Sequence, residues 1–382
     1  MDKFVRTLEP KNHPQLSWEK NKDKRKNFNR LHYGQLKLLL SEIEHLTQVQ
    51  RRIDLSTATV IYIGAGGGEH IPLLSSLFPK LHFILVDDHF SIQPTNTIEI
   101  FYEYASDETI QKYKAHARKN IIFISDMRRG NEENFEKSVN DDNMNQMKWG
   151  IQLDAFSMLL KFRLPYPDMY MNTHYTTTID NSIRNHVVSP KTVPNNTYLY
   201  LKGEPKLQAW APLYSTETRL EVFKRKDNKW SMDCYDPKQY EDACLYFNEI
   251  TRSSNTSYKE SQWVPYHIAG MDNRYDAVGE FYILRSYIYQ NQKKNVFANT
   301  VKLMKYVHDY MYSSQNMIHK MIYDINQIGK DKDKMDLAKR YIKDIKKYCK
   351  YQLKLIQKYR RSSILSIHDY EQQIKILRKE MN

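Results

Sequence analysis

Apolar and polar residues alternate along most of the chain in blocks whose spacing distinguishes helices from strands. Five apolar positions near the start recur every three or four residues and predict a helix over 33–50, namely Leu36, Leu39, Leu40, Ile43 and Leu46. Six short apolar runs predict strands, at 59–64, 81–87, 120–126, 155–165, 196–204 and 218–226. Longer periodic segments predict two further helices, over 240–252 and 277–290.

This alternation predicts an α/β fold in which helices cover both faces of a doubly wound, mostly parallel sheet. In such folds ligands bind at the carboxyl ends of the strands. Residues 1–30 are polar, basic and contain proline, which is typical of an arm, and the pattern is helical throughout beyond about residue 291. We therefore expect a basic N-terminal arm over 1–30, an α/β domain over 31–290 and a basic helical extension over 291–382.

A strand runs into a glycine-rich turn over 60–70, with the sequence VIYIGAGGGEH. Glycines at Gly64, Gly66 and Gly68 let the backbone turn sharply and let a ligand approach main-chain N–H groups. The next strand ends at Asp87, about 20 residues later, where nucleotide-binding α/β folds accept hydrogen bonds from ribose hydroxyls. The pattern therefore predicts an adenosine-containing cofactor.

The details of the turn favour one class of cofactor over another. A dinucleotide-binding turn has the pattern Gly-x-Gly-x-x-Gly, whereas Glu69 takes the final position here. An acidic residue is a poor neighbour for a pyrophosphate, but it suits a positively charged ligand such as the sulfonium of S-adenosylmethionine. A nicotinamide-dependent dehydrogenase is thereby disfavoured, and a tight turn that binds no ligand stays open as the alternative.

The net charge of the chain indicates what kind of partner it binds. Its value of +13 points to an anionic partner, with RNA or DNA as the first candidate, although a charge run is more often a solvated face.

The cysteine content indicates the compartment. The three cysteines form no ligand-like pair and cannot all be joined in disulfides, which favours a reducing compartment and no structural zinc. The chain shows neither a signal core nor an apolar run of membrane-spanning length, so we expect a soluble intracellular protein without a membrane partner.

Four charged residues lie in or beside apolar stretches, where an isolated charge is costly and needs a partner, namely Lys37, Asp126, Lys161 and Glu217. Converged, they form a Lys-Asp-Lys-Glu tetrad suited to methyl transfer onto a ribose hydroxyl. Partial burial and a like-charged neighbour lower a lysine pKa, so Lys161 can accept the hydroxyl proton while Lys37 repels its charged form. The two carboxylates orient the amines, and no metal is needed. Taken singly, each residue is more often a cap or a solvated charge.

Around these residues the chain resembles the poxvirus cap-specific mRNA 2'-O-methyltransferases, which also serve as the small, processivity subunit of the viral poly(A) polymerase. The resemblance covers about residues 30–290. It rests on YGQLKLLL at 33–40, ATVIYIG at 58–64, ISD at 124–126, GNE at 130–132, KFRLPYPD at 161–168, PLYS at 212–215 with Glu217 and Arg219, and LR at 284–285. All four tetrad positions occur in the family's order.

The resemblance implies a class I, Rossmann-like methyltransferase fold that binds S-adenosyl-L-methionine and acts on the 7-methylguanosine cap at the 5' end of mRNA. The implied cofactor contacts are Gln35, Tyr62, Gly64, Gly66, Gly68, His70, Asp87 and Ala105. The implied cap contacts are Trp18, Tyr166, Asp168 and Glu241, with Phe28 as the alternative to Trp18 for the ring opposite Tyr166. A cation–π contribution favours such rings around a positively charged base.

The resemblance also implies a viral protein of the host cytoplasm and the virion, whose partner is the poly(A) polymerase catalytic subunit. The main rival is a non-catalytic RNA-binding subunit of that polymerase, which the basic helical extension favours as an added role. The chain departs from the family where Asp88 and His89 replace a Gly-Arg pair after the ribose-binding aspartate. Its tail beyond about 314 has no poxvirus counterpart.

Overall fold

The computed structural model describes residues 6–9, 34–130, 135–166, 179–212, 215–252 and 273–311. The chain divides into two compact units, Met1–His308 and Asp309–Asn382. The first unit reaches beyond residue 290, where the sequence pattern placed the domain boundary, because the buried His308 side chain pairs with the buried Glu280 carboxylate 2.8 Å away. Most of the second unit, with the predicted helices beyond residue 311, lies outside the described residues, as does most of the N-terminal arm.

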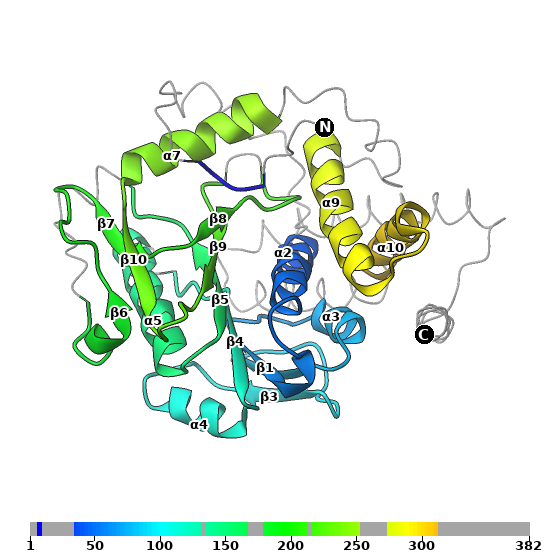
Figure 1. The fold of residues 1–382 in the computed structure, drawn as a ribbon, viewed down its shortest axis with the longest axis horizontal. Helices are drawn as coiled ribbons and strands as arrows, with labels where there is room; N and C mark the ends of the chain where they lie inside the picture. The colour runs from blue at the N-terminus through cyan, green and yellow to red at the C-terminus, as the bar shows by residue number, and fades with distance from the viewer. Residues whose placement is uncertain are drawn as a thin grey trace, which may run out of the picture. The chain divides into compact units, whose positions relative to one another are not determined.

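Two sheets organise the first unit (Figure 1). The large sheet has the strand order β3-β2-β1-β4-β5-β9-β8, and the small sheet has the order β6-β10-β7. The strands are β1 Ala58–Ile63, β2 His82–Asp87, β3 Ile98–Tyr102, β4 Asn120–Ser125, β5 Ser157–Phe162, β6 Val187–Val188, β7 Tyr198–Leu201, β8 Glu204–Lys206, β9 Thr218–Phe223 and β10 Trp230–Tyr235. Strands β1 to β5 pair in parallel, and β9 is antiparallel to both β5 and β8. This topology confirms the predicted doubly wound, mostly parallel α/β fold.

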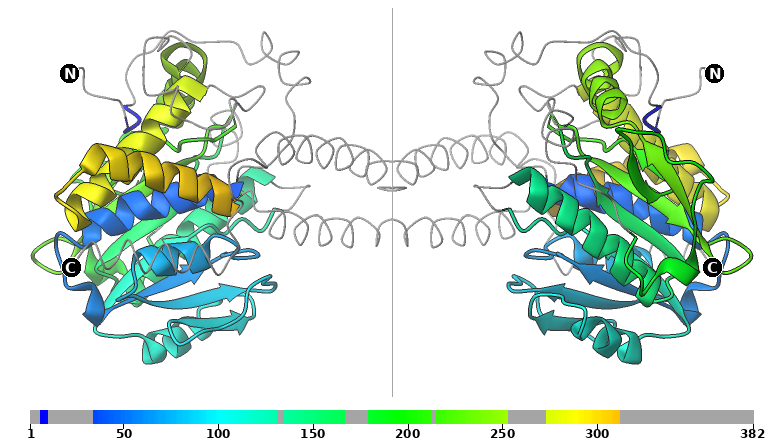
Figure 2. Two further views of the ribbon diagram at one scale, coloured as in Figure 1. Left: turned by 90° about the vertical axis from the view of Figure 1, so that its right-hand side faces the viewer. Right: turned by 90° about the vertical axis from the view of Figure 1, so that its left-hand side faces the viewer.

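Helices cover both faces of the large sheet, with α2 and α3 on one side and α5 on the other (Figure 1). The helices are α2 Gly34–Val49, α3 Ile71–Leu77, α4 Thr109–His116, α5 Phe135–Gln152, α7 Pro237–Tyr246, α9 Asn273–Asn291 and α10 Val296–Met311, with a π-helix, η4, at Phe247–Thr251 and short 3-10 turns at Leu55–Thr57 and Arg184–His186. Figure 2 shows α9 beside α2. No helix in the described segments has the length and apolar character needed to cross a membrane.

The inner strands β1, β2, β4 and β5 are mainly apolar because both faces of the large sheet are covered. All six residues of β1 are buried, and a single core joins its side chains to those of α5 and the small sheet. The small sheet packs on α5 through tyrosine hydroxyls, since Tyr200 donates to the carbonyl of Asn143 at 2.8 Å and Tyr198 to Asn140 at 3.1 Å.

The strand predicted at 196–204 belongs to the small sheet and not, as expected, to the large one. The apolar run at 196–204 was expected to continue the large sheet, but β7 pairs with β10 in the small sheet instead. The place beside β9 is taken by β8, whose three residues are too few to give a period-2 signal. An apolar run shows that a strand is buried on both faces, but it carries no information on which sheet receives it.

The N-terminal segment closes the edge of the large sheet beyond β8. Leu8 donates from its backbone N–H to the carbonyl of Pro205 at 2.8 Å, and Leu207 donates to the carbonyl of Arg6 at 2.8 Å. Arg6 also pairs with Glu44 of α2 at 2.6 Å. These contacts cover backbone groups that would otherwise be left unpaired at an edge strand.

Candidate active site

The glycine turn joins β1 to α3 at the carboxyl edge of the sheet. Gly64, Gly66 and Gly68 all have positive φ, at 75°, 58° and 71°, in the left-handed region that favours glycine. A Cβ at Gly64 would lie 2.7 Å from the backbone nitrogen of Met127, whereas one at Gly66 would meet no atom within 4 Å. The turn therefore packs closely against the loop after β4 at Gly64 and faces open space at Gly66.

Asp87 ends β2 beside this turn, as the sequence pattern predicts. Its Oδ2 accepts the backbone N–H of Gly66 at 2.8 Å, and its Oδ1 accepts the N–H of Asp88 at 2.8 Å. Burial, a hydrogen bond to the Asp88 carboxyl and the charge of that neighbour raise the pKa of Asp87 to about 6. Asp88 is in turn bound by the hydroxyl of Tyr104, which is largely exposed. Ala105 follows in the same loop, partly buried against the core.

The other candidate cofactor residues form a buried group behind the turn. The His70 ring is fully buried, and its nitrogens contact the Gln35 amide oxygen and, at 3.0 Å, the Glu42 carboxylate. Tyr62 of β1 is also fully buried, and burial together with the Glu42 carboxylate raises its pKa well above the ordinary value. His70 therefore orients Gln35, which is the second residue of α2 and is only partly buried.

The four tetrad residues come together at the same edge of the sheet, although they lie on α2, after β4, on β5 and before β9. Lys37 Nζ lies 2.9 Å from Glu217 Oε1, and Lys161 Nζ lies 3.2 Å from Glu217 Oε2. Lys161 Nζ also lies 3.1 Å from Asp126 Oδ1. The cluster adjoins the glycine turn, because the N–H of Asp126 donates to the carbonyl of Ile63 at 3.0 Å.

A fifth charged side chain, Arg219 of β9, belongs to this cluster. Its guanidinium pairs with Asp126 and reaches Glu217 at 3.5 Å, and it donates to the carbonyl of Ser125 at 3.2 Å. The sequence analysis included Arg219 in the family match but not among the site residues. Its position two residues after Glu217, a spacing that places side chains on the same side of an extended segment, was the available signal.

Burial and the crowded charges shift the ionisation of the cluster. Burial lowers the pKa of Lys37, and the cations Arg219 and Lys161 lower it further against the opposing effect of Glu217. Burial alone would raise the carboxyl pKa values, but for Asp126 the neighbours Arg219 and Lys161 prevail and its pKa is lowered. For Glu217 the two lysines and Arg219 prevail, and its pKa lies well below the usual range. Both carboxylates are thus ionised at neutral pH.

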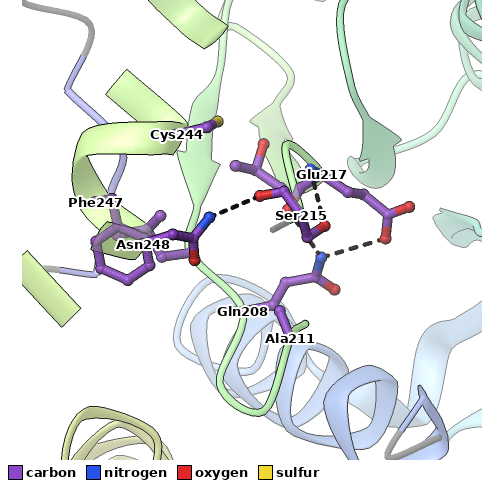
Figure 3. A pocket seen from close by; sticks show the side chains of 9 residues that line it. Gln208, Ala211, Ser215, Glu217, Cys244, Phe247 and Asn248 are labelled. Carbon is purple, nitrogen blue, oxygen red and sulfur yellow. Dashed lines mark hydrogen bonds between the residues drawn. The ribbon is translucent and has the colours of Figure 1, made fainter. Parts of the chain in front are cut away.

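A small hollow lies behind Glu217, between the segment after β8 and the end of α7 (Figure 3). The Gln208 side chain faces Glu217 in it, and Asn248 donates to the carbonyl of Ser215 at 2.9 Å. Ser215 in turn accepts the N–H of Glu217 at 3.1 Å through its hydroxyl. Glu217 therefore forms hydrogen bonds with the neutral side chains of Gln208 and Ser215, in addition to its ion pairs with the cations of the cluster.

The candidate cap residues are only partly described. Tyr166 follows β5, and the Arg163 guanidinium lies over one face of its ring, 4.2 Å from the centroid. Glu136 at the start of α5 pairs with Arg163 at 2.6 Å and accepts the N–H of Tyr166 at 2.9 Å. Glu241 lies on α7, partly buried. Trp18, its alternative Phe28, and Asp168 lie outside the described residues.

Known proteins resemble this chain over most of the described region. A family model described as the poly A polymerase regulatory subunit matches residues 11–317. The cap-specific mRNA (nucleoside-2'-O-)-methyltransferase of Myxoma virus (strain Lausanne) is 26% identical over 256 residues, which are 63% of this chain and 68% of the relative. The enzyme of the same name from Fowlpox virus (strain NVSL) is 30% identical over 199 residues, 49% of this chain and 56% of the relative.

Among solved structures, the bluetongue virus VP4 capping protein aligns with a TM-score of 0.39 and 12% identity, over 54% of this chain and 30% of that chain. The family model, by contrast, covers the sheet, the glycine turn and all four tetrad positions, well over half of the chain. The chain therefore belongs to the poly(A) polymerase regulatory subunit family.

Proposed function

We propose that this protein is a cap-specific mRNA 2'-O-methyltransferase, which transfers a methyl group from S-adenosylmethionine to the ribose 2'-hydroxyl of the first transcribed nucleotide. The observation that carries the proposal is the convergence of Lys37, Asp126, Lys161 and Glu217 next to a glycine turn and a strand-end aspartate. The names of the Myxoma and Fowlpox relatives support the same reaction.

The residues of the turn fit the proposed cofactor. The space around Gly66 accommodates a ligand against the backbone, and Asp87 offers carboxylate oxygens to ribose hydroxyls. Glu69 Oε2 is buried and has no hydrogen-bond partner among the described residues, so it can accept from the ammonium group of the methionine portion. When bound, S-adenosylmethionine supplies an activated methyl group.

The tetrad supplies the base for the ribose hydroxyl. Arg219 is permanently charged, so the two carboxylates balance Arg219 and one lysine, and the cluster is neutral when the other lysine is uncharged. When uncharged, the amine of Lys161, which contacts Asp126 and Glu217, would accept the proton of the ribose hydroxyl. The carboxylates orient the amine, and positioning of the two reactants lowers the barrier further.

A methyl-transfer assay on short capped and uncapped RNAs, followed by nucleoside analysis, tests this proposal. We expect one methyl group per capped RNA, on the 2'-oxygen of the first nucleotide, and none on uncapped RNA. Methylation of a base, or equal methylation of both RNAs, would contradict it.

Cofactor affinity is expected to fall in acid because of Asp87. An ionised carboxylate accepts from both ribose hydroxyls, and the Asp87 pKa of about 6 means that the acceptor is progressively lost below that pH. Binding of S-adenosylmethionine should therefore weaken by up to about tenfold per pH unit below 6, as measured by calorimetry. Asp88→Asn removes the neighbouring charge that raises the pKa of Asp87, so in this variant the loss of cofactor affinity should begin at a lower pH. An unchanged dependence of cofactor affinity on pH would exclude Asp87 as the titrating group.

The cap is proposed to stack on the face of Tyr166 that Arg163 leaves uncovered. Glu136 neutralises Arg163, so a positively charged 7-methylguanine meets a ring backed by an ion pair rather than by a bare cation. Asp168 and Glu241 are proposed to accept from the guanine edge, and Trp18 to supply the opposite ring.

Tyr166→Ala is expected to raise KM for capped RNA by about 10- to 100-fold, since stacking contributes about 1–3 kcal/mol per base. KM for S-adenosylmethionine should stay unchanged. Tyr289→Ala, which removes an exposed tyrosine of α9, serves as the matched control. Equal KM for capped RNA in the Tyr166 and Tyr289 variants would refute the stacking role.

The family description supports a second, added role as a subunit of a poly(A) polymerase. We propose that the catalytic subunit of such a polymerase is a partner of this chain. Co-purification of the two proteins, with longer poly(A) tails in the presence of this chain, would support the role; a tail length independent of this chain would argue against it.

A further inference from the structure

Gln208 contacts two charged members of the active-site cluster through the two ends of one amide. The side chain is buried and follows β8. Its Oε1 accepts from Arg219 Nε at 3.0 Å. Its Nε2 donates to the side-chain Oε1 and to the backbone oxygen of Glu217, both at 3.3 Å (Figure 3).

The amide satisfies both partners because it carries an acceptor and a donor. The Arg219 guanidinium has donors and no acceptor, so it requires the amide oxygen. The ionised Glu217 carboxylate has acceptors and no donor, so it requires the amide NH₂. These partners therefore fix the amide orientation. A glutamate would place a second anion against Glu217, and a leucine would leave both partners without this contact.

The two oxygens of Glu217 face different lysines, and the amide binds the one that faces Lys37. Oε1 receives Gln208, Lys37 at 2.9 Å and Arg219 at 3.5 Å. Oε2 is thereby directed to Lys161 at 3.2 Å. We propose that Gln208 is a positioning residue of the reaction, which holds the Glu217 carboxylate between Lys37 and Lys161 and so keeps the Lys161 amine in place for the ribose hydroxyl. The proposal rests on the methyltransferase function proposed above.

The segment that carries Gln208 is anchored to α9. Trp210, two residues further on, has a φ of 61°, which is unusual for a residue with a side chain. Its backbone N–H donates to Asp276 Oδ1 at 2.9 Å, and its indole Nε1 donates to Glu280 Oε2 at 2.7 Å. Trp210, Asp276 and Glu280 are all buried, so the backbone that presents the amide has little freedom to move.

Two substitutions at Gln208 test the proposal through different physical changes. Gln208→Leu keeps the approximate volume and removes all three hydrogen bonds of the amide. We expect kcat to fall about tenfold or more while KM for capped RNA and for S-adenosylmethionine stays within about twofold, the pattern of an interaction used only in the transition state. Gln208→Glu adds a negative charge that stabilises the protonated lysines. The rising limb of its kcat–pH profile should therefore move to higher pH.

Gln146→Met is the matched comparison, because Gln146 is a buried amide that binds the backbone oxygen of Lys161 at 2.7 Å and, in the described part of the chain, makes no hydrogen bond to a charged side chain of the cluster. We expect it to lower the thermal midpoint without moving the pH profile. Wild-type kcat and pH profile in both Gln208 variants, with only a lower thermal midpoint, would reduce Gln208 to a structural residue and overturn the proposal.

The role of Gln208 can also be tested without measuring methyl transfer, by titrating the lysines of the cluster. The lysine amines can be titrated by NMR in the full-length protein, where Gln208→Glu should raise the pKa of Lys37 above that of the wild type. An unchanged Lys37 titration would overturn the positioning role even in an active enzyme. Absence of methyl transfer by the wild-type protein would instead overturn the proposed function, and the Lys37 titration would still decide whether Gln208 controls the cluster.

Discussion

Lys161→Ala is expected to reduce methyl transfer by about 10²- to 10⁴-fold, the usual contribution of a general base. The amine of Lys161 contacts both carboxylates of the cluster, at 3.1 Å and 3.2 Å, and it is the group proposed to accept the ribose proton. Neither the glycine turn nor Tyr166 depends on this side chain. Dissociation constants for S-adenosylmethionine and for capped RNA should therefore stay close to the wild-type values. Single-turnover rates at saturating substrates measure the effect directly.

Two further variants show whether Lys161 acts as a proton acceptor or only as a positive charge. Lys161→Arg keeps a cation in contact with Asp126 and Glu217 but cannot be deprotonated, so it should be nearly as inactive as Lys161→Ala. Lys202→Ala removes an exposed lysine of the surface and should leave the rate unchanged. Substantial activity in Lys161→Arg would show that the residue acts through its charge, and would leave Lys37, whose pKa burial lowers, as the candidate base.

The sheet was predictable wherever a buried strand had several apolar residues in a row. Runs at 59–64, 81–87 and 120–126 coincide with β1, β2 and β4 to within a residue or two. β3 and β10 were missed because their residues are mostly half-buried and include charged or polar side chains. The helix predicted over 240–252 includes the π-helix and overlaps α7, which starts earlier, at Pro237, because Asp236 caps its first turn.

The convergence of the four charged residues was predicted from their places among apolar neighbours. Asp126 and Lys161 lie at the carboxyl ends of two parallel strands, β4 and β5, which meet at one edge of the sheet. Gln208 carried no such signal, since a neutral amide among apolar residues has no charge that demands a partner. Arg219 lies in β9, where a lone arginine is most simply explained as an exposed charge. The spacing of two residues places Glu217 and Arg219 on one side of the chain, but the contact of Gln208 with Glu217 and that of Arg219 with Asp126 are tertiary and no local spacing encodes them. The Arg163–Tyr166 stack likewise requires the approach of α5.

Gly66→Ala is expected to weaken binding of S-adenosylmethionine by about 10- to 100-fold while the protein still folds, each factor of ten corresponding to about 1.4 kcal/mol. A methyl group at Gly66 meets no protein atom within 4 Å, so it would extend into the space proposed for the cofactor. The positive φ of 58° adds strain of about 1–2 kcal/mol for a residue with a Cβ. Calorimetric titration and thermal unfolding of the same samples measure the two effects separately.

Gly64→Ala is the contrasting substitution in the same turn. Its Cβ would lie 2.7 Å from the backbone nitrogen and 2.8 Å from the Cα of Met127, so the turn would have to move away from the loop that carries Asp126. We therefore expect a large loss of thermal stability at Gly64, and a loss of cofactor affinity with modest destabilisation at Gly66. The contrast follows from which side of the turn each Cβ faces: protein backbone at Gly64 and open space at Gly66. Tight binding of S-adenosylmethionine by a folded Gly66→Ala protein would mean that the cofactor does not lie against this turn.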